Sequence, residues 1–388
     1  MDTARRFQAI YFVTFAAFSG FEVYRNVFFQ ELGMSATQMG LLGALFVASG
    51  VAAQPAWGLV ADYTRSPTRV LTIAAVLSAV ALSSYPVAAV TPAPFLVVAL
   101  GTVVYAATEA PLLPVSNGLL VSRGYNYALT RSFGSLSFGA TVLVIGWLLA
   151  RTGVEIVVYI YVAGMALLVL LLRGVPSVEE RVFEGSLGRK AVGLVRQPRY
   201  LLVVLAAFVL GGVSFAGAAF FSVYMRAIGL GDGLTGVAWA TKTVAEIVVF
   251  LALSRIDRRF GLAVAVAGLA YAGGYATLSW FPALGPVLAA NVALGVGVAL
   301  VYFALVNLAH DCAPDGLDST AQTLVTSVGI GIGGVLGEVT VGHLVDTVGV
   351  QSMYRYLAVA ALALTVCGLL LVVGRIRHTP AEPAATAE

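Results

Sequence analysis

Charged residues, cysteine and histidine are all scarce in this chain of 388 residues. Only 11% of the residues are charged and 60% are hydrophobic, whereas soluble domains usually carry about 25% charged residues. With a mean hydropathy of +0.94, this composition excludes a soluble globular protein. The net charge of +3 gives no indication of a nucleic-acid partner.

Clusters of reactive or metal-ligating residues are also missing. The two cysteines, Cys312 and Cys367, do not suggest a disulfide framework. The three histidines are scattered, no Cys or His cluster has metal-ligand spacing, and no phosphate-binding glycine loop of the ATPase type is present. We therefore expect a protein that is not an enzyme and has no cofactor.

Long apolar runs make up most of the chain instead. A membrane-crossing helix needs about 20 predominantly apolar residues. The first run contains Glu22 and Arg25 and lacks a small-residue cleavage site, so we interpret it as a retained helix rather than a signal peptide. The sequence predicts an all-α integral membrane protein with twelve transmembrane helices, at 8–30, 38–61, 70–90, 94–121, 128–150, 155–173, 200–227, 233–254, 261–280, 285–309, 320–345 and 351–374.

Lysine and arginine are distributed unevenly between the connecting loops. If the N-terminus is cytoplasmic, 16 of the 22 lie on the cytoplasmic side, and only Arg151, Arg226 and Arg355 lie on the other side. Because lysine and arginine in short loops favour the cytoplasmic side, both termini are expected inside. We expect a multi-pass protein of the plasma membrane.

The chain contains an internal repeat. Three residues of the first part recur 195 or 196 residues later: Gly33 as Gly229, Gly40 as Gly236, and Asp62 as Asp257. We expect two pseudo-symmetric six-helix bundles, 1–173 and 200–378, joined by a polar cytoplasmic linker at 174–199 and followed by a disordered tail at 379–388.

The loop after the second predicted helix carries a recognisable motif. The segment from Gly58 to Arg69 has the glycine, aspartate and paired-basic pattern of the major facilitator superfamily, which the whole chain resembles. The matching segment of the second part is 257–261. The resemblance implies two rocking bundles and gating contacts at the inner ends of the helices, made by Gly58, Asp62, Arg65, Arg69, Asp257, Arg258 and Arg259.

Further motifs resemble the proton-coupled permeases related to lactose permease, nucleoside symporters and phenylpropionate permease. They are Pro111 to Asn117, Tyr127 to Phe138, Trp239 with Glu246, and Gly331 to Gly337. This resemblance implies that Arg131 and Glu246 contact the solute. Asn117 stands where that branch commonly has an acid, and Glu109, two helical turns earlier on roughly the same face, is expected to replace it.

Seven charged residues fall inside the predicted helices. Such residues usually face a bundle interior or a wet cavity. All seven lie on helices that line the central cavity in the superfamily: Glu22, Arg25, Glu109, Arg131, Lys242, Glu246 and Glu338. Lys242 with Glu246, and Glu22 with Arg25, have the spacing of ion pairs along one helix face. Structural ion pairs are the alternative to a solute site.

Four carboxylates against three bases leave one acid without an obvious cation. A buried carboxyl of this kind can gain and lose a proton near neutral pH, as proton coupling requires. Glu109 is the first choice for this proton site, with Glu22, Glu246 and Glu338 as alternatives. An outer gate is an equally good interpretation of Glu338.

These observations predict a monomeric secondary transporter that moves a small polar organic solute, such as a sugar, nucleoside or organic acid, by proton symport. The expected solute-binding residues are Arg131, Asn117, Glu246, Lys242, Glu22, Arg25, Trp239 and Tyr105. A proton-coupled exporter is the nearest alternative. A membrane sensor or lipid-handling protein on the same fold is an alternative of another class.

Overall fold

The computed structural model describes residues 3–64, 66–121, 123–125, 127–175, 194, 196–253, 259–313 and 318–378. Within these residues the secondary structure is helical. In chain order the helices are α1 (Thr3–Glu31), α2 (Ala36–Thr64), α3 (Pro67–Leu82), α4 (Ser84–Ala88), α5 (Pro94–Glu109), α6 (Leu112–Val121), α7 (Tyr127–Thr152), α8 (Ile156–Leu172), α10 (Pro198–Ala219), α11 (Phe221–Ala227), α12 (Gly231–Leu253), α13 (Phe260–Trp280), α14 (Leu284–Cys312), α15 (Asp318–Thr323), the π-helical η1 (Leu324–Gly331), α16 (Ile332–Val348) and α17 (Val350–His378).

Each of the twelve predicted segments corresponds to one long helix or to consecutive shorter ones. Ten of the resulting passes are long and apolar enough to cross a membrane. The other two are α8, which is apolar but only 17 residues long, and α1, which carries Glu22, Arg25 and Asn26 in its second half. The protein is therefore a multi-pass membrane protein.

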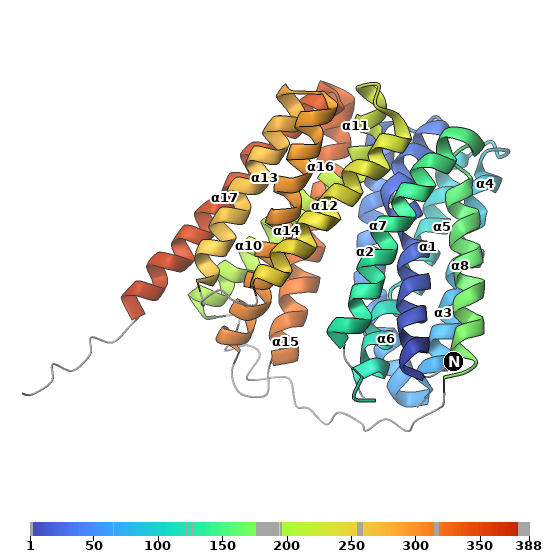
Figure 1. The fold of residues 1–388 in the computed structure, drawn as a ribbon, viewed down its shortest axis with the longest axis horizontal. Coiled ribbons are helices and arrows are strands. Elements are labelled where there is room, and N and C mark those ends of the chain that lie inside the picture. The colour runs from blue at the N-terminus through green and yellow to red at the C-terminus, as the bar shows by residue number, and fades with distance from the viewer. Residues whose placement is uncertain are drawn as a thin grey trace, which may run out of the picture.

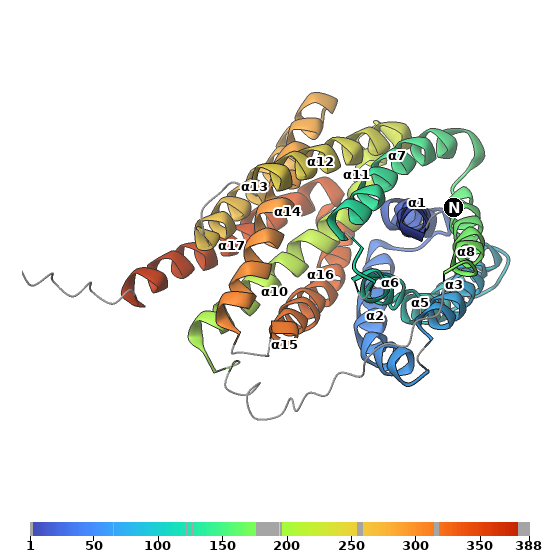
Figure 2. The same cartoon turned by 60° about the horizontal axis from the view of Figure 1, so that its bottom comes forward.

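Figures 1 and 2 show that the helices form two bundles. The first bundle contains α1 to α8, and the second contains α10 to α17. Two seams join them: α2 packs against α16, and α7 packs against α12. In the repeat these are equivalent pairs, because each joins the second helix of one part to the fifth helix of the other.

The glycines of the repeat occupy equivalent places in the structure. Gly33 and Gly229 have φ of 76° and 79°, which only glycine adopts readily, in the turns before α2 and α12. Gly40 lies against the backbone of Glu338 on α16, and Gly236 lies against the backbone of Val142 on α7. A Cβ at either position would lie under 3 Å from a carbonyl oxygen across the seam. The repeat is thus present in three dimensions.

The two bundles are held together at one end, which we call the closed end. There Arg226 donates to Glu31 at 2.8 Å and to Asp232, and the Asp346 carboxylate accepts from the backbone N–H groups that begin α2. Tyr24 also donates to the backbone oxygen of Asp232 at 3.0 Å. Toward the N-terminus of α1 the bundles diverge (Figure 1), and we call that side the open end.

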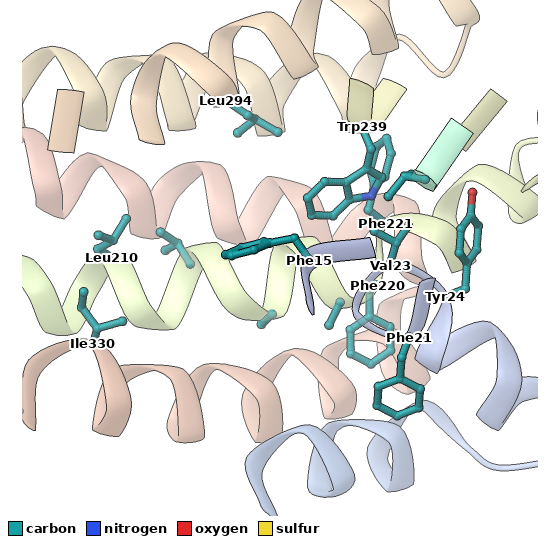
Figure 3. Packing of buried hydrophobic residues seen from close by; sticks show 14 of the residues in the cluster. Phe15, Phe21, Val23, Tyr24, Leu210, Phe220, Phe221, Trp239, Leu294 and Ile330 are labelled. Atoms are coloured by element: carbon teal, nitrogen blue, oxygen red, sulfur yellow. The ribbon is translucent and has the colours of Figure 1, made fainter. Parts of the chain in front are cut away.

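Aromatic side chains and close helix crossings form the core of each bundle (Figure 3). Two glycines make a close helix crossing in the second bundle: Gly211 contacts the backbone oxygen of Ile330, and Gly333 contacts that of Phe208. This brings α10 against η1 and α16. A Cβ at Gly211 or Gly333 would overlap these backbone oxygens, so the crossing depends on glycine.

Candidate functional site

The seven charged residues come from five helices of the two bundles, and we call them the charged cluster. They are Glu22 and Arg25 on α1, Glu109 on α5, Arg131 on α7, Lys242 and Glu246 on α12, and Glu338 on α16. Glu22 is at the centre of the cluster, because it interacts electrostatically with four of the others: Arg25, Glu109, Lys242 and Glu338. Glu246 connects the remaining member, Arg131, to Lys242.

A buried ion pair links the bundles on the closed side of the cluster. Arg25 donates to Oε1 of Glu338 at 2.6 Å, and both side chains are almost fully buried. The carboxyl group of Glu338 rests against Gly43, where a Cβ would lie 2.4 Å from Oε2. The Arg25 guanidinium also stacks over the Phe46 ring at 5.2 Å. This pair requires α1, α2 and α16 to be in contact.

The pairing of Arg25 differs from the pairing that its spacing predicts. Glu22, three residues earlier, was the expected partner, but the Arg25 side chain extends across the seam to Glu338. The reason is tertiary: Gly40 and Gly43 open a notch in α2 through which Glu338 reaches Arg25. Glu22 remains within electrostatic range.

Glu109 is the last residue of α5, because Ala110 and Pro111 interrupt the helix before α6 begins at Leu112. Proline lacks the N–H that would continue the helical hydrogen bonds. The fourth predicted segment thus has a short break between Glu109 and Asn117, and the expectation that Glu109 replaces the acid at Asn117 stays a prediction. The charged neighbour of Glu109 is Glu22, and Tyr105, one turn earlier on α5, contacts Phe21 and Phe46.

On the second bundle Lys242 and Trp239 lie one turn apart on α12. The Lys242 ammonium is 4.4 Å from the centre of the Trp239 ring, which contacts Phe138 of the first bundle at 5.9 Å. Lys242 interacts electrostatically with Glu246, as its spacing predicts, although within the described chain no ion pair of under 4.0 Å joins them. These side chains form the second-bundle wall of the site.

Two further predicted residues lie toward the open end. The Arg131 guanidinium stacks over Phe15 at 4.1 Å and donates to Ser135 Oγ at 3.2 Å. Asn117 accepts a hydrogen bond from the Tyr11 hydroxyl through Oδ1. Within the described residues Arg131 is thus held by Phe15 and Ser135 with much of its hydrogen-bonding capacity unused, since a guanidinium has five N–H donors.

The predicted inner gate is only partly visible. Arg65, Asp257 and Arg258, as well as the side chain of Asp62, lie outside the described residues. Arg69 and Arg259 are exposed. Gly58 was expected at a close helix contact, yet a Cβ there would meet no atom of the described residues within 4 Å. The bundles diverge at this end, which explains why the contact is missing.

Several residues of the site have no strong signal in the sequence. Phe15 and Tyr11 hold Arg131 and Asn117, and Phe46 lies beneath Arg25. Nothing separates these aromatics from the other buried aromatic residues of the core. The pair Gly40 and Gly43 could have been found, because small residues about one turn apart commonly mark close crossings of membrane helices.

These features define a class of protein: a helical membrane protein of two pseudo-symmetric bundles, with a charged and aromatic site at their interface. Residues 4–356 match the family model described as the MFS_1 like family. The chain belongs to this family, and hence to the major facilitator superfamily of transporters.

Individual relatives agree with this assignment. The chain is 29% identical over 375 residues to "Maltose permease" of Geobacillus stearothermophilus, covering 94% of this chain and 92% of the relative. It is 22% identical to "Uncharacterized transporter YwbF" of Bacillus subtilis (strain 168). The crystal structure of the nucleoside transporter NupG has a TM-score of 0.82 at 16% identity, over 96% of this chain and 99% of NupG, which shows the same fold. The chain is therefore a transporter of small molecules and not an enzyme.

Proposed function

We propose that the protein is a proton-coupled importer of a neutral, hydroxyl-rich solute of the sugar class, working by alternating access. The observation that carries this proposal is the pair Glu22 and Glu109. The two carboxyl groups, on α1 and α5, are within electrostatic range of each other, while Arg25, the cation nearest to Glu22 in sequence, is bound to Glu338. Two carboxyl groups in one site favour sharing a proton over both being charged.

The charge of the site favours a neutral solute. With Arg25 and Glu338 paired, the remaining members of the cluster are three carboxylates, Glu22, Glu109 and Glu246, and two cations, Arg131 and Lys242. Their formal sum is −1, which disfavours an organic anion unless protons accompany it. Charged hydrogen-bonding groups together with aromatic rings suit a sugar. The relation to a maltose permease supports this class.

The described helices support a twelve-helix topology. We propose that residues 1–173 and 200–378 move as two bundles joined by the segment 174–199, with 379–388 as a tail, and that a monomer is the working unit. The loops at the closed end are those that the lysine and arginine pattern places outside. The structure then represents an inward-facing state of a plasma-membrane protein with both termini cytoplasmic.

In this topology Arg25 and Glu338 form the outer gate. Opening the outer side separates α2 from α16, and Arg25 then exchanges Glu338 for Glu22, three residues away on its own helix. The pair predicted from the sequence thus belongs to the outward-facing state. This exchange changes the charge balance around Glu22 and Glu109 as the gate opens, which provides a physical link between gating and proton binding.

The test is uptake of labelled maltose into proteoliposomes whose interior is alkaline. The parent should accumulate maltose above its external concentration, and Glu109→Gln should abolish accumulation but retain equilibrating exchange, because Gln cannot carry a proton. Tyr159→Phe, on an exposed face of α8, is the control. Uphill uptake by Glu109→Gln would contradict the assignment of the proton site.

The same vesicles separate the alternatives. Accumulation that appears only in vesicles with an acidic interior would indicate a proton-exchanging exporter. Movement of neither sugars nor nucleosides in either gradient would contradict import of this solute class and favour a sensor or lipid-handling role.

A further inference from the structure

A small hollow lies inside the second bundle, behind the wall formed by α12. Its volume is about 20 Å³, and it is bounded by α10, α11, α12, α13 and α14. The polar or aromatic side chains around it include Ser214, Trp239, Lys242, Tyr271, Tyr275 and Asn291. A cavity needs roughly 10–15 Å³ to hold one water molecule. The hollow therefore has room for one oxygen atom with its hydrogens and for little more.

The hydrogen-bonding groups around the hollow leave donors unused. Tyr271 donates to Ser214 Oγ, Tyr275 donates to the backbone oxygen of Val213, and Asn291 donates to that of Val287. The indole N–H of Trp239 is buried and has no hydrogen-bond partner within the described residues. An indole nitrogen can only donate. The hollow is thus suited to an acceptor oxygen.

The hollow adjoins the interface between the bundles. Lys242, one of its walls, interacts electrostatically with Glu22 of the first bundle, and Trp239, another wall, contacts Phe138 of α7. Figure 3 shows Trp239 beside Phe221, which also lines the hollow. A solute held among the charged cluster can therefore reach the unused indole N–H with a protruding group.

We propose that this hollow is a subsite for one hydroxyl group of the transported solute. A water molecule accepts from the Trp239 indole N–H when no solute is bound, and a solute hydroxyl replaces that water on binding. The Lys242 ammonium adds a second donor, and among the described residues no carboxylate lines the hollow. The subsite rejects a cationic group, for want of a counter-charge, and a group larger than hydroxyl, for want of space. This proposal rests on the proposed function, since it takes the solute to be hydroxylated.

The first test looks for the bound water without solute and then with maltose. In the ¹⁵N-labelled protein in nanodiscs, the Trp239 indole N–H should show a magnetisation-transfer signal from a long-lived water. Trp57, whose indole N–H donates to the backbone oxygen of Ala107 at 2.7 Å, should show none and serves as the internal control. Maltose should remove the Trp239 signal. Absence of a water signal at Trp239, or a signal that persists with maltose bound, would overturn the proposal.

The second test separates the indole N–H from the aromatic ring. Trp239→Phe keeps a ring against Phe138 and Lys242 but removes the donor, so maltose should bind about 2- to 10-fold more weakly by calorimetry. Trp147→Phe, the same change at an exposed position of α7, should leave binding unchanged. Equal affinity of parent and Trp239→Phe would contradict the subsite. If the parent itself does not bind maltose, the proposed solute class fails, and the water signal alone then decides whether the hollow binds an oxygen.

Discussion

Individual residues of the site are held by their neighbours before any solute arrives. Arg131 is an example, because Phe15 lies beneath its guanidinium and Ser135 accepts one of its N–H groups. Such support fixes the plane of the guanidinium and leaves the other N–H donors for a ligand. Lys242 is similarly placed over Trp239. A site preorganised in this way loses little entropy when the solute binds.

Replacing Arg131 by Lys should therefore weaken solute binding by about 10-fold or more, because an ammonium cannot reproduce two parallel hydrogen bonds. Folding and insertion should be unaffected. The matched control is Arg151→Lys at the other end of α7, where the guanidinium stacks over the exposed Trp147. The measurement is maltose affinity by calorimetry in detergent. Unchanged affinity in Arg131→Lys would reduce Arg131 to a structural residue.

At the scale of helices, the sequence predicted which segments are helical but not how each is interrupted. The fourth predicted segment was expected to be continuous, and Pro111 divides it directly after Glu109. Periodicity detects apolar faces, whereas a break depends on whether neighbouring helices stabilise the freed backbone groups. The partner of Arg25 was missed for a related reason, since an ion pair between residues 313 apart depends on how α2 and α16 cross.

The seam between α2 and α16 gives a prediction for two glycines of one helix. Gly43→Ala should destabilise the closed end, because its Cβ would lie 2.4 Å from the Glu338 carboxyl. Overpacking of this kind costs about 1–3 kcal/mol, which corresponds to a 5- to 150-fold shift toward the outward-open state. Gly50→Ala, also on α2, is the control, because its Cβ would lie 3.8 Å from the backbone oxygen of Ala106 in the same bundle, which is an ordinary contact. Spin-label distances across the closed end measure the shift, and equal distributions in the two variants would contradict it.

In the proposed transport cycle the whole molecule is organised around two opposed gates, of which the structure describes one in detail. The repeat in the sequence was sufficient to predict two related bundles, and the equivalent seams at Gly40 and Gly236 confirm that relation. The sequence could not predict which gate is closed, because both states bury similar helix faces. The ratio of the two states depends on a few contacts between the bundles, each of which can be altered separately.

Glu338→Gln should open the outer gate, since it leaves the buried Arg25 without its counter-charge. Removing one partner of a buried pair costs about 3–5 kcal/mol, so the outward-open population should rise by about 100-fold or more. In a background lacking Cys312 and Cys367, labelling of Val47→Cys, a buried position on α2, should accelerate. Labelling of Leu59→Cys, which is exposed near the open end, should slow. Unchanged labelling at both positions would show that the pair does not act as a gate.

Asp62→Asn and Asp257→Asn should act in the opposite direction. The two aspartates occupy equivalent places in the repeat, each is close to arginines in the sequence, and such contacts can stabilise only a state in which the inner ends of the bundles meet. Neutralising either aspartate should shift the population by about 5- to 150-fold toward the inward-open state, with the larger effect for Asp62. Because the two gates are far apart, combining Asp62→Asn with Glu338→Gln should give the sum of the two free-energy changes. The same two cysteine positions report the ratio of states. Labelling rates in Asp62→Asn and Asp257→Asn that equal those of the parent would remove both aspartates from the gating mechanism.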